Sequence, residues 1–265
     1  MTRVDGQVLI TGATGGLGHS IARGFAAAGA QLTLSGRRVE VLEPLAAQLS
    51  ARTIAADLSS RAEVAALAER AGAVDVLVAN AALPATGRIF KLDQREIDTL
   101  LEVNLRSQIA LARALLPGML ERGSGHLVFV SSLAGKAASP GASLYNATKF
   151  GLRGFALAIR EDLRGSGVSA SVVLPGFVAD AGMFHDSGAK LPPGVGLAKP
   201  EQVANAVLKA VRRDRAELAV APLGLRIATE IGALAPGISG RFQALAGGNG
   251  LADAMTAGQA DKRPL

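Results

Sequence analysis

Ser132, Tyr145 and Lys149, near and just after the middle of the chain, carry side chains that can bond to or move a proton. Tyr145 is the only tyrosine of the chain, and Lys149 lies four residues after it, in a segment whose pattern predicts a helix over Leu144–Arg164. Residues four apart share a helix face. A lysine ammonium there stabilises a phenolate and lowers a phenol pKa that is ordinarily near 10. The spacing therefore predicts an acid–base pair.

A glycine-rich turn near the start of the chain forms a second candidate site. It reads Thr11-Gly12-Ala13-Thr14-Gly15-Gly16-Leu17-Gly18 and joins a predicted strand to a predicted helix. Glycine lets the chain turn tightly and lets a pyrophosphate approach the backbone. The free N–H groups and the dipole at the start of the helix attract an anion. The strand–turn–helix context therefore favours phosphate binding over a chance run of glycines.

The elements that position these residues alternate along the chain. Short apolar runs predict strands at Val8–Thr11, Leu32–Ser35, Thr53–Ala56, Val74–Ala79, His126–Val130, Ser169–Leu174 and Leu218–Ala221. Helical periodicity predicts helices at Gly16–Ala28, Val39–Leu49, Arg61–Ala71, Ile97–Arg122, Leu144–Arg164 and Pro200–Arg213. Pro44 and Pro117 are expected to kink two of them or to shift a boundary. Continuous apolar strands joined by helices predict an α/β fold, a doubly wound parallel sheet of about seven strands with helices on both faces.

Two segments interrupt this alternation. No linker divides residues 1–221, which are expected to form one domain, and within them Phe177–Lys199 is long and rich in Gly and Pro, which predicts a lid or binding loop. Residues 222–265 are expected to form an apolar helical extension, divided in two by Gly232 and Pro236-Gly237, with Ala252–Leu265 loosely ordered. Its apolar stripe consists of Leu223, Ile227, Ile231, Leu234, Ile238, Phe242 and Leu245.

The extension has three possible roles: to cover the substrate mouth, to pack against another subunit, or to lie on a membrane surface. Arg226, Glu230 and Arg241 lie near the stripe, which favours packing over peripheral membrane contact.

Composition excludes several classes of protein. Of 265 residues, 49% are hydrophobic and none is cysteine, so the chain buries a sizeable core without disulfides or thiol chemistry. No apolar stretch is long enough for a membrane span or a signal peptide, so a cytoplasmic location is expected. Three histidines make a His-rich metal site unexpected.

The net charge of +6 invites a nucleic-acid interpretation. The densest basic cluster, Arg212, Arg213 and Arg215, lies at the end of a predicted helix, where cations favour the negative end of the dipole. No aromatic residues are interleaved with it. We therefore do not expect nucleic acid as a partner.

Taken together, the motifs resemble those of the short-chain dehydrogenases/reductases, in their single-domain branch, over roughly Gly6 to Ala221. The turn Thr11–Gly18 resembles the coenzyme turn of that family. Tyr145 follows Ser132 by 13 positions and precedes Lys149 by four, in the order and spacing of the family's catalytic residues. The resemblance implies a Rossmann-type fold and hydride transfer between a nicotinamide coenzyme and an alcohol/carbonyl pair.

The resemblance also assigns roles to single residues. The catalytic set would comprise Ser132, which orients the substrate oxygen; Tyr145, the general acid or base; Lys149, which also binds the nicotinamide ribose; and Asn104, which supports a water between Lys149 and solvent. Ala79 and Ala82 depart from the family's Asn-Asn-Ala-Gly motif. Beyond Tyr145 and Lys149, the coenzyme contacts implied are Gly12, Thr14, Gly15, Gly16, Leu17, Gly18, Asp57, Leu58, Asn80, Ala81, Ala82, Pro175, Gly176 and Val178.

The residues after the second strand bear on the choice of coenzyme. Ser35-Gly36-Arg37-Arg38 has no acidic residue to bind the ribose hydroxyls and repel a 2′-phosphate, and its two guanidinium groups suit a phosphate. Gly15 points the other way, because many NADP(H)-preferring relatives carry Arg or Lys at that position. We therefore expect NADP(H), with NAD(H) as the alternative.

The substrate pocket is expected beyond the carboxyl ends of the strands. An apolar lining by Leu133, Phe177, Met183, Phe184 and Leu191 would suit an apolar alcohol or carbonyl compound. Two alternatives remain open: a non-catalytic coenzyme-binding regulatory or scaffold protein, which the complete Ser–Tyr–Lys set opposes, and a 3-oxoacyl-thioester reductase. Relatives form dimers or tetramers through the helices that match Ile97–Arg122 and Leu144–Arg164, so a homo-oligomer is expected.

Overall fold

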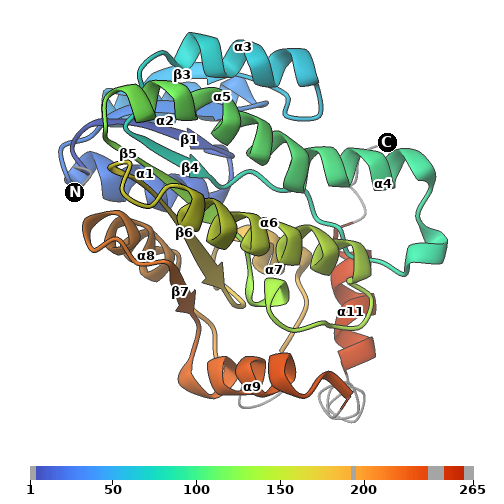
Figure 1. Cartoon of the computed structure of the whole chain (residues 1–265). Helices are drawn as coiled ribbons and strands as arrows, with labels where there is room; N and C mark the ends of the chain where they lie inside the picture. Colours follow the sequence, from blue (N-terminus) through green and yellow to red (C-terminus); the bar gives the residue numbers. More distant parts are fainter. Residues whose placement is uncertain (1–3, 192–194, 238–247, 260–265) are drawn as a thin grey trace.

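A parallel sheet of seven strands forms the central layer of the structure (Figure 1). The computed structural model describes residues 4–191, 195–237 and 248–259. The order across the sheet is β3-β2-β1-β4-β5-β6-β7, and every neighbouring pair is parallel. The predicted doubly wound α/β fold is confirmed. The strands are β1 (Gln7–Thr11), β2 (Gln31–Gly36), β3 (Arg52–Ala55), β4 (Val76–Ala79), β5 (Gly125–Val130), β6 (Val168–Pro175) and β7 (Glu217–Val220).

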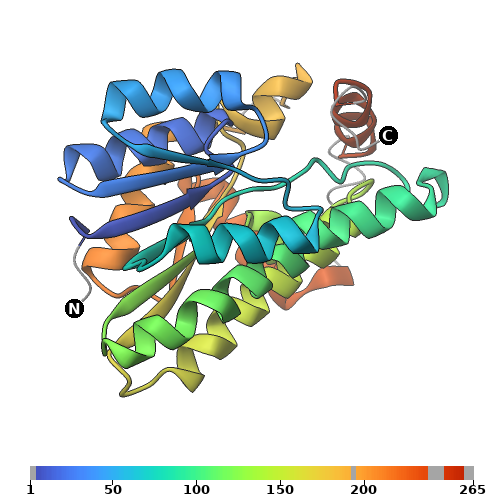
Figure 2. The same cartoon turned by 90° about the horizontal axis from the view of Figure 1, so that it is seen from above.

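Helices cover both faces of the sheet (Figure 2). In β5, Leu127 and Phe129 point into one apolar cluster, whereas Val128 and Val130 point into the other. Because the strands are buried on both sides, their apolar residues are continuous rather than alternating. One cluster includes residues of α3 (Arg61–Ala71), α5 (Ser107–Glu121) and α6 (Ser143–Asp162), and the other those of α1 (Gly16–Ala27), α2 (Val39–Leu49) and α8 (Pro200–Arg212).

The helix predicted at Ile97–Arg122 is present, but it starts three residues earlier and is interrupted by a π-helical segment. The chain forms α4 (Gln94–Leu101), a five-residue π-helical segment (Glu102–Arg106) and then α5. α4 begins earlier than its apolar pattern because Asp93 caps it and Glu96 bonds back to the cap, a reciprocal capping box. The π-helical segment contains Asn104, one of the predicted site residues.

Both internal prolines lie within continuous helices. α2 runs through Pro44 and α5 runs through Pro117, so neither boundary moves to the proline. The predicted strands are confirmed, with ends that shift by one or two residues.

The predicted loop Phe177–Lys199 contains a short helix, α7 (Gly182–Ser187), and Val178 forms an isolated bridge with Ala198. These contacts order the start and the end of the segment.

The predictions for residues 222–265 need two corrections. α9 (Leu223–Leu234) continues through Gly232, although glycine costs a helix about 1 kcal/mol relative to alanine. Gly232 is buried on the inner side of the helix, where packing outweighs the poor propensity. Residues 252–257, expected to be loosely ordered, belong to α11 (Gly248–Ala257). Ile238, Phe242, Leu245 and residues 260–265 lie outside the described residues.

The outer side of α9 presents apolar side chains to solvent. The exposed fractions of Leu223, Ile227, Ile231 and Leu234 are 68%, 52%, 54% and 87%. Among the described residues, none of the helices has the length and apolarity that crossing a bilayer requires.

Candidate active site

The turn between β1 and α1 is packed so tightly that two of its positions have no room for a side chain. Gly12 has φ +64°, and a Cβ added to it would lie 2.6 Å from the Cα of Ala81. A Cβ on Gly18 would collide with the carbonyl oxygen of Gly12. α1 starts after Gly15 without a side-chain cap and without an acidic residue in its first turn. Its first N–H groups therefore remain available to an anion, as a pyrophosphate needs.

Asn80 fastens the end of β4 to this turn. Its amide Nδ2 donates to the carbonyl oxygens of Thr11 (3.1 Å) and Gly12 (3.2 Å). The Thr11 hydroxyl oxygen accepts from the backbone N–H groups of Asn80 (3.2 Å) and Ala81 (3.3 Å). These bonds hold the carboxyl ends of β1 and β4 together at the topological switch point of the sheet, where the strand order reverses.

The two arginines after β2 differ in what they contact. Arg38 Nη2 donates to the backbone carbonyl of Thr14 at 2.8 Å, which ties it to the glycine-rich turn. Arg37 is exposed and has no hydrogen-bond or ion-pair partner within the described ranges. Arg37 is therefore free to meet a ligand, whereas Arg38 supports the turn.

The acidic candidate Asp57 lies in a tight turn after β3. Its Oδ1 accepts from the backbone N–H of Ser59 at 2.9 Å, and its own N–H donates to Glu63 at 2.8 Å. The side chain of Leu58 is buried in the apolar core, so only its backbone can face a ligand.

Ser132 and Lys149 are held by backbone groups at the carboxyl ends of β5 and β6. The Ser132 hydroxyl donates to the carbonyl oxygen of Pro175 (3.3 Å) and accepts from the N–H of Ala134 (3.1 Å). Lys149 is 2% exposed, and its Nζ donates to the carbonyl oxygen of Val130 at 3.1 Å. That Nζ lies 5.6 Å from the ring centre of Tyr145. The three predicted catalytic residues therefore converge at one place.

Burial shifts the pKa values of both ionisable groups. It raises the pKa of Tyr145 to about 12, opposed by a hydrogen bond with Ser132, and it lowers the pKa of Lys149 to about 8. The expectation that Lys149 brings the phenol pKa below 10 is wrong for the protein alone, because desolvation of the phenolate outweighs other contributions.

A pocket of about 740 Å³ opens onto these residues. The five apolar residues predicted from the sequence line it, and the rings of Phe177 and Phe184 meet edge to face at 5.0 Å. The inner side of α9 contributes Leu225, Ala228 and Thr229. The pocket also brings together predicted site residues from distant parts of the chain, namely Leu17, Asn80, Ala82, Ser132, Tyr145, Lys149, Pro175, Gly176 and Val178.

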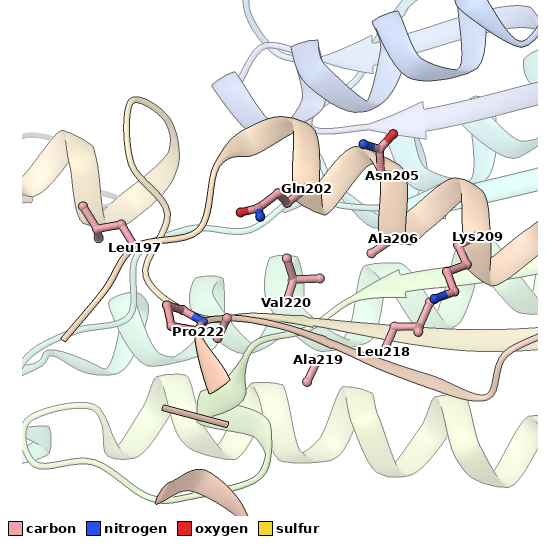
Figure 3. A pocket seen from close by; sticks show the side chains of 10 residues that line it. Leu197, Gln202, Asn205, Ala206, Lys209, Leu218, Ala219, Val220 and Pro222 are labelled. Carbon is pink, nitrogen blue, oxygen red and sulfur yellow. The ribbon is translucent and has the colours of Figure 1, made fainter. Parts of the chain in front are cut away.

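Another hollow, of about 440 Å³, lies between α8 and β7 (Figure 3). Gln202, Asn205 and Lys209 line it from α8, together with residues of β7. None of the predicted catalytic residues lines this hollow, so it is separate from the candidate active site.

Asn104 does not line the pocket. It is fully buried, its Oδ1 accepts from the N–H of Leu83 (2.7 Å), and its Nδ2 donates to the carbonyl oxygen of Leu83 (2.8 Å). Gln108, one helical turn on, donates to the carbonyl oxygen of Ala81 at 2.8 Å. These amides hold the segment after β4 in place, and the water-binding role of Asn104 stays a prediction.

The profile of the family described as short chain dehydrogenase matches residues 7–192. The chain belongs to this family. It is 38% identical over 230 residues to "Ketoacyl reductase HetN" of a Nostoc species, covering 83% of this chain and 80% of that protein.

Solved structures of other family members superpose closely. A metagenomic short-chain oxidoreductase in complex with NADP has a TM-score of 0.70 and 30% identity, over 83% of this chain and 98% of that one. A 3-ketoacyl-(acyl-carrier-protein) reductase from Brucella melitensis complexed with NADH has a TM-score of 0.73 and 27% identity, over 81% of this chain and 96% of that one.

Asn146, next to Tyr145, positions part of the candidate site and was not predicted from the sequence. Its Nδ2 donates to the carbonyl oxygens of Ala134 (2.6 Å) and Ala137 (3.0 Å), and its Oδ1 accepts from the N–H of Ser139 (3.2 Å). It therefore fixes the loop that follows Ser132. An asparagine one residue after Tyr145 gives no local signal of this role, because its partners lie up to 12 residues away.

Proposed function

We propose that this member of the family is an oxidoreductase that prefers NADP(H) and interconverts an apolar carbonyl compound and the corresponding alcohol. The observation that carries the proposal is the convergence of Ser132, Tyr145 and Lys149 in an apolar pocket that also contains Leu17 and Asn80 of the coenzyme turn region. Acid–base groups and a phosphate-binding turn at one cavity are what hydride transfer to a carbonyl requires.

The nicotinamide coenzyme supplies the hydride for reduction and accepts it in oxidation. In reduction the Tyr145 hydroxyl gives its proton to the carbonyl oxygen, so that hydride and proton together yield the alcohol. The Ser132 hydroxyl holds that oxygen. The phenolate left on Tyr145 is stabilised by the nearby Lys149 ammonium and regains a proton from solvent. In oxidation the same groups act in reverse.

The proposed preference for NADP(H) rests on Arg37, which is exposed and has no side-chain partner among the described residues. A guanidinium is a suitable partner for a 2′-phosphate, and the turn Ser35–Arg38 has no carboxylate to repel one. Family members with bound NADP and with bound NADH both superpose on this chain, so the fold itself accommodates either coenzyme.

A 3-oxoacyl thioester is a second candidate substrate. It is supported by the similarity to a protein named ketoacyl reductase and to a 3-ketoacyl-(acyl-carrier-protein) reductase. The chemistry at Tyr145 is the same, and only the group attached to the carbonyl differs.

We also propose a homo-oligomer in the cytoplasm. Leu101, Leu120 and Phe150 are 36%, 43% and 42% exposed on α4, α5 and α6, the helices that the family resemblance places between subunits. Light scattering after size exclusion tests this proposal, and a monomer at micromolar concentration would contradict it.

The test of the function follows oxidation of NADPH and of NADH with three carbonyl classes: methyl ketones, aryl ketones and acetoacetyl-coenzyme A. We expect turnover with a ketone, faster with NADPH than with NADH, and loss of turnover in Tyr145→Phe. Faster turnover of the thioester identifies the second candidate. Tight NADPH binding without turnover of any class would instead favour a coenzyme-binding scaffold.

A further inference from the structure

The segment Gly248–Gln259 lies beyond the part of the chain that the family profile matches, yet it reaches the candidate active site. α11 packs against α7 of the loop after β6 (Figure 1). Leu251, Met255 and Gln259 line the pocket that contains Tyr145. This segment therefore forms one wall of the pocket.

Gln259 joins two separate parts of that wall. Its side chain is 1% exposed, its Oε1 accepts from the Thr86 hydroxyl at 2.7 Å, and its Nε2 donates to the carbonyl oxygen of Met183 at 2.7 Å. Thr86 lies in the segment after β4, whose Gly87 donates to the carbonyl oxygen of Gly141 just before α6. A buried amide with both ends bonded fixes the distance between the two parts it joins.

Gly258 brings the backbone of the tail directly onto α7. A Cβ added at this position would collide with the carbonyl oxygen of Ser187, the last residue of α7. Any larger residue at 258 would therefore push the tail and α7 apart.

α7 in turn lies against the coenzyme turn. A Cβ on Gly16 would lie 2.6 Å from the Cβ of Ala181, and one on Gly182 would lie 3.7 Å from the side chain of Leu17. The pocket therefore has the coenzyme turn on one side of α7 and the tail on the other.

We propose that Gly258 and Gln259, here called the tail clasp, hold α7 closed over the pocket and so determine how long an apolar substrate the enzyme selects. Gln259 is a positioning residue, because it acts through α7. The selection rests on the function proposed above, whereas the closure of α7 does not. A chain that reaches the wall formed by α7 and α11 gains about fourfold in affinity for each methylene that it buries there.

Hydrogen exchange tests the closure without any turnover. In Gln259→Ala we expect the amides of α7 to exchange at least about tenfold faster, with the rest of the sheet unchanged. Asp253→Asn, which removes only the solvent-exposed 4.0 Å ion pair of α11 with Arg88, is the matched control and should leave α7 unchanged. Unchanged exchange of α7 in Gln259→Ala would overturn the proposal.

Gln259→Glu provides a second test that depends on pH. A protonated carboxyl group both donates to Met183 and accepts from Thr86, whereas a carboxylate cannot donate. Burial at position 259 should raise the pKa of this carboxyl group above its ordinary value of about 4.3. Relative to the wild type at the same pH, α7 should therefore be protected at pH 5 and exchange faster at pH 8. If the α7 exchange rate of Gln259→Glu, divided by that of the wild type, is the same at both pH values, a clasp built on these two hydrogen bonds is contradicted.

Kinetics then test the selection of length, with saturating NADPH and the methyl ketones from 2-butanone to 2-decanone. We expect kcat/KM of the wild type to rise with chain length and the rise to flatten in Gln259→Ala, through a higher KM for 2-decanone at unchanged kcat for 2-butanone. An equal loss for every ketone would overturn the selection. Faster exchange of α7 in an enzyme that reduces no ketone would uphold the clasp and overturn the substrate assignment.

Discussion

At the carboxyl ends of the strands, Tyr145 and Lys149 lie against a pocket, whereas near the amino ends His126 is enclosed between β5 and its neighbours. His126 is 1% exposed, and its Nε2 lies 2.7 Å from the hydroxyl of Ser171 on β6. Burial lowers its pKa to about 4, helped by Arg160 and opposed by Asp214. Both ends of the sheet therefore contain buried groups with shifted pKa values.

The two ends of the sheet differ in whether the charged groups near the buried residue are paired with each other or line a pocket. Near His126, Arg160 bonds to Ser169 (2.7 Å) and pairs with Asp214 (2.7 Å), so the charges are matched within the protein. Lys149 is held by a single carbonyl, with the phenol ring beside it, and both line the pocket. A shifted pKa alone does not identify an active site, because the same burial can serve packing at one end and proton transfer at the other.

The largest expected effect is at the carboxyl end. Tyr145→Phe removes the proposed proton donor and keeps the ring, so kcat/KM should fall by about 10²–10⁴-fold. The dissociation constant for NADPH and the melting temperature should change little. Steady-state kinetics, NADPH fluorescence titration and thermal unfolding measure the three quantities. Retained activity would exclude Tyr145 as the acid and remove the functional difference between the two ends.

His126 should affect stability without affecting catalysis. Its folded pKa of about 4 lies below the unfolded value of 6.5, so the unfolded state binds more protons between these pH values. Its contribution to stability is complete above pH 6.5 and is lost as the pH falls to 4, by about 3 kcal/mol. Urea unfolding across this range measures it. His126→Gln should flatten the dependence, and an unchanged slope in that variant would refute the assignment.

The buried charge of Lys149 should lower the free energy of unfolding of the coenzyme-free protein. Burial lowers the pKa of Lys149 from 10.5 to about 8, so this residue is still charged at pH 7 but its charge costs folding free energy, and stability should rise as the pH rises from 8 to 10.5. Lys149→Met should therefore stabilise the coenzyme-free protein by about 1–3 kcal/mol at pH 7 and abolish turnover. Calorimetry and activity assays check both results. A destabilised, inactive variant would make Lys149 structural, as His126 is.

The smallest expected effect separates the two arginines after β2. Arg37→Ala should weaken NADPH binding about tenfold and leave NADH binding unchanged, because only the 2′-phosphate contact is lost. Arg38→Ala should weaken both coenzymes together, since Arg38 holds the carbonyl of Thr14. Fluorescence titration with each coenzyme measures this. Equal effects of Arg37→Ala on both coenzymes would contradict the NADP(H) preference.

Local patterns predicted much of this molecule. The positions of the strands along the chain, the glycine-rich turn and the spacing of Tyr145 and Lys149 were all predicted. Each of these features depends only on residues within about one helical turn or one strand of each other. Asp93 and Glu96 have the spacing of a capping box and mark the start of α4. The prediction followed the apolar pattern instead and placed the start of the helix at Ile97.

Contacts between distant segments were not predictable in this way. Thr86 and Gln259 are 173 residues apart, and no periodicity relates them. The amide of Asn104 bonds to a loop 21 residues earlier, and the pKa of Tyr145 depends on how much protein surrounds it rather than on its neighbour at i+4. Tertiary packing decides these features.

The π-helical segment between α4 and α5 affects how many residues separate these two helices. A π-turn contains one residue more than the α-turn it replaces, so it acts as a single-residue insertion. The wider turn takes up this residue locally, so α4 and α5 keep the angular phase of one continuous α-helix. Deleting one residue between Glu102 and Arg106 would therefore give a uniform helix that still buries Leu100, but it would displace the Asn104 amide from the backbone of Leu83. The extra residue thus brings the Asn104 amide to the segment after β4 without turning α4 away from the core.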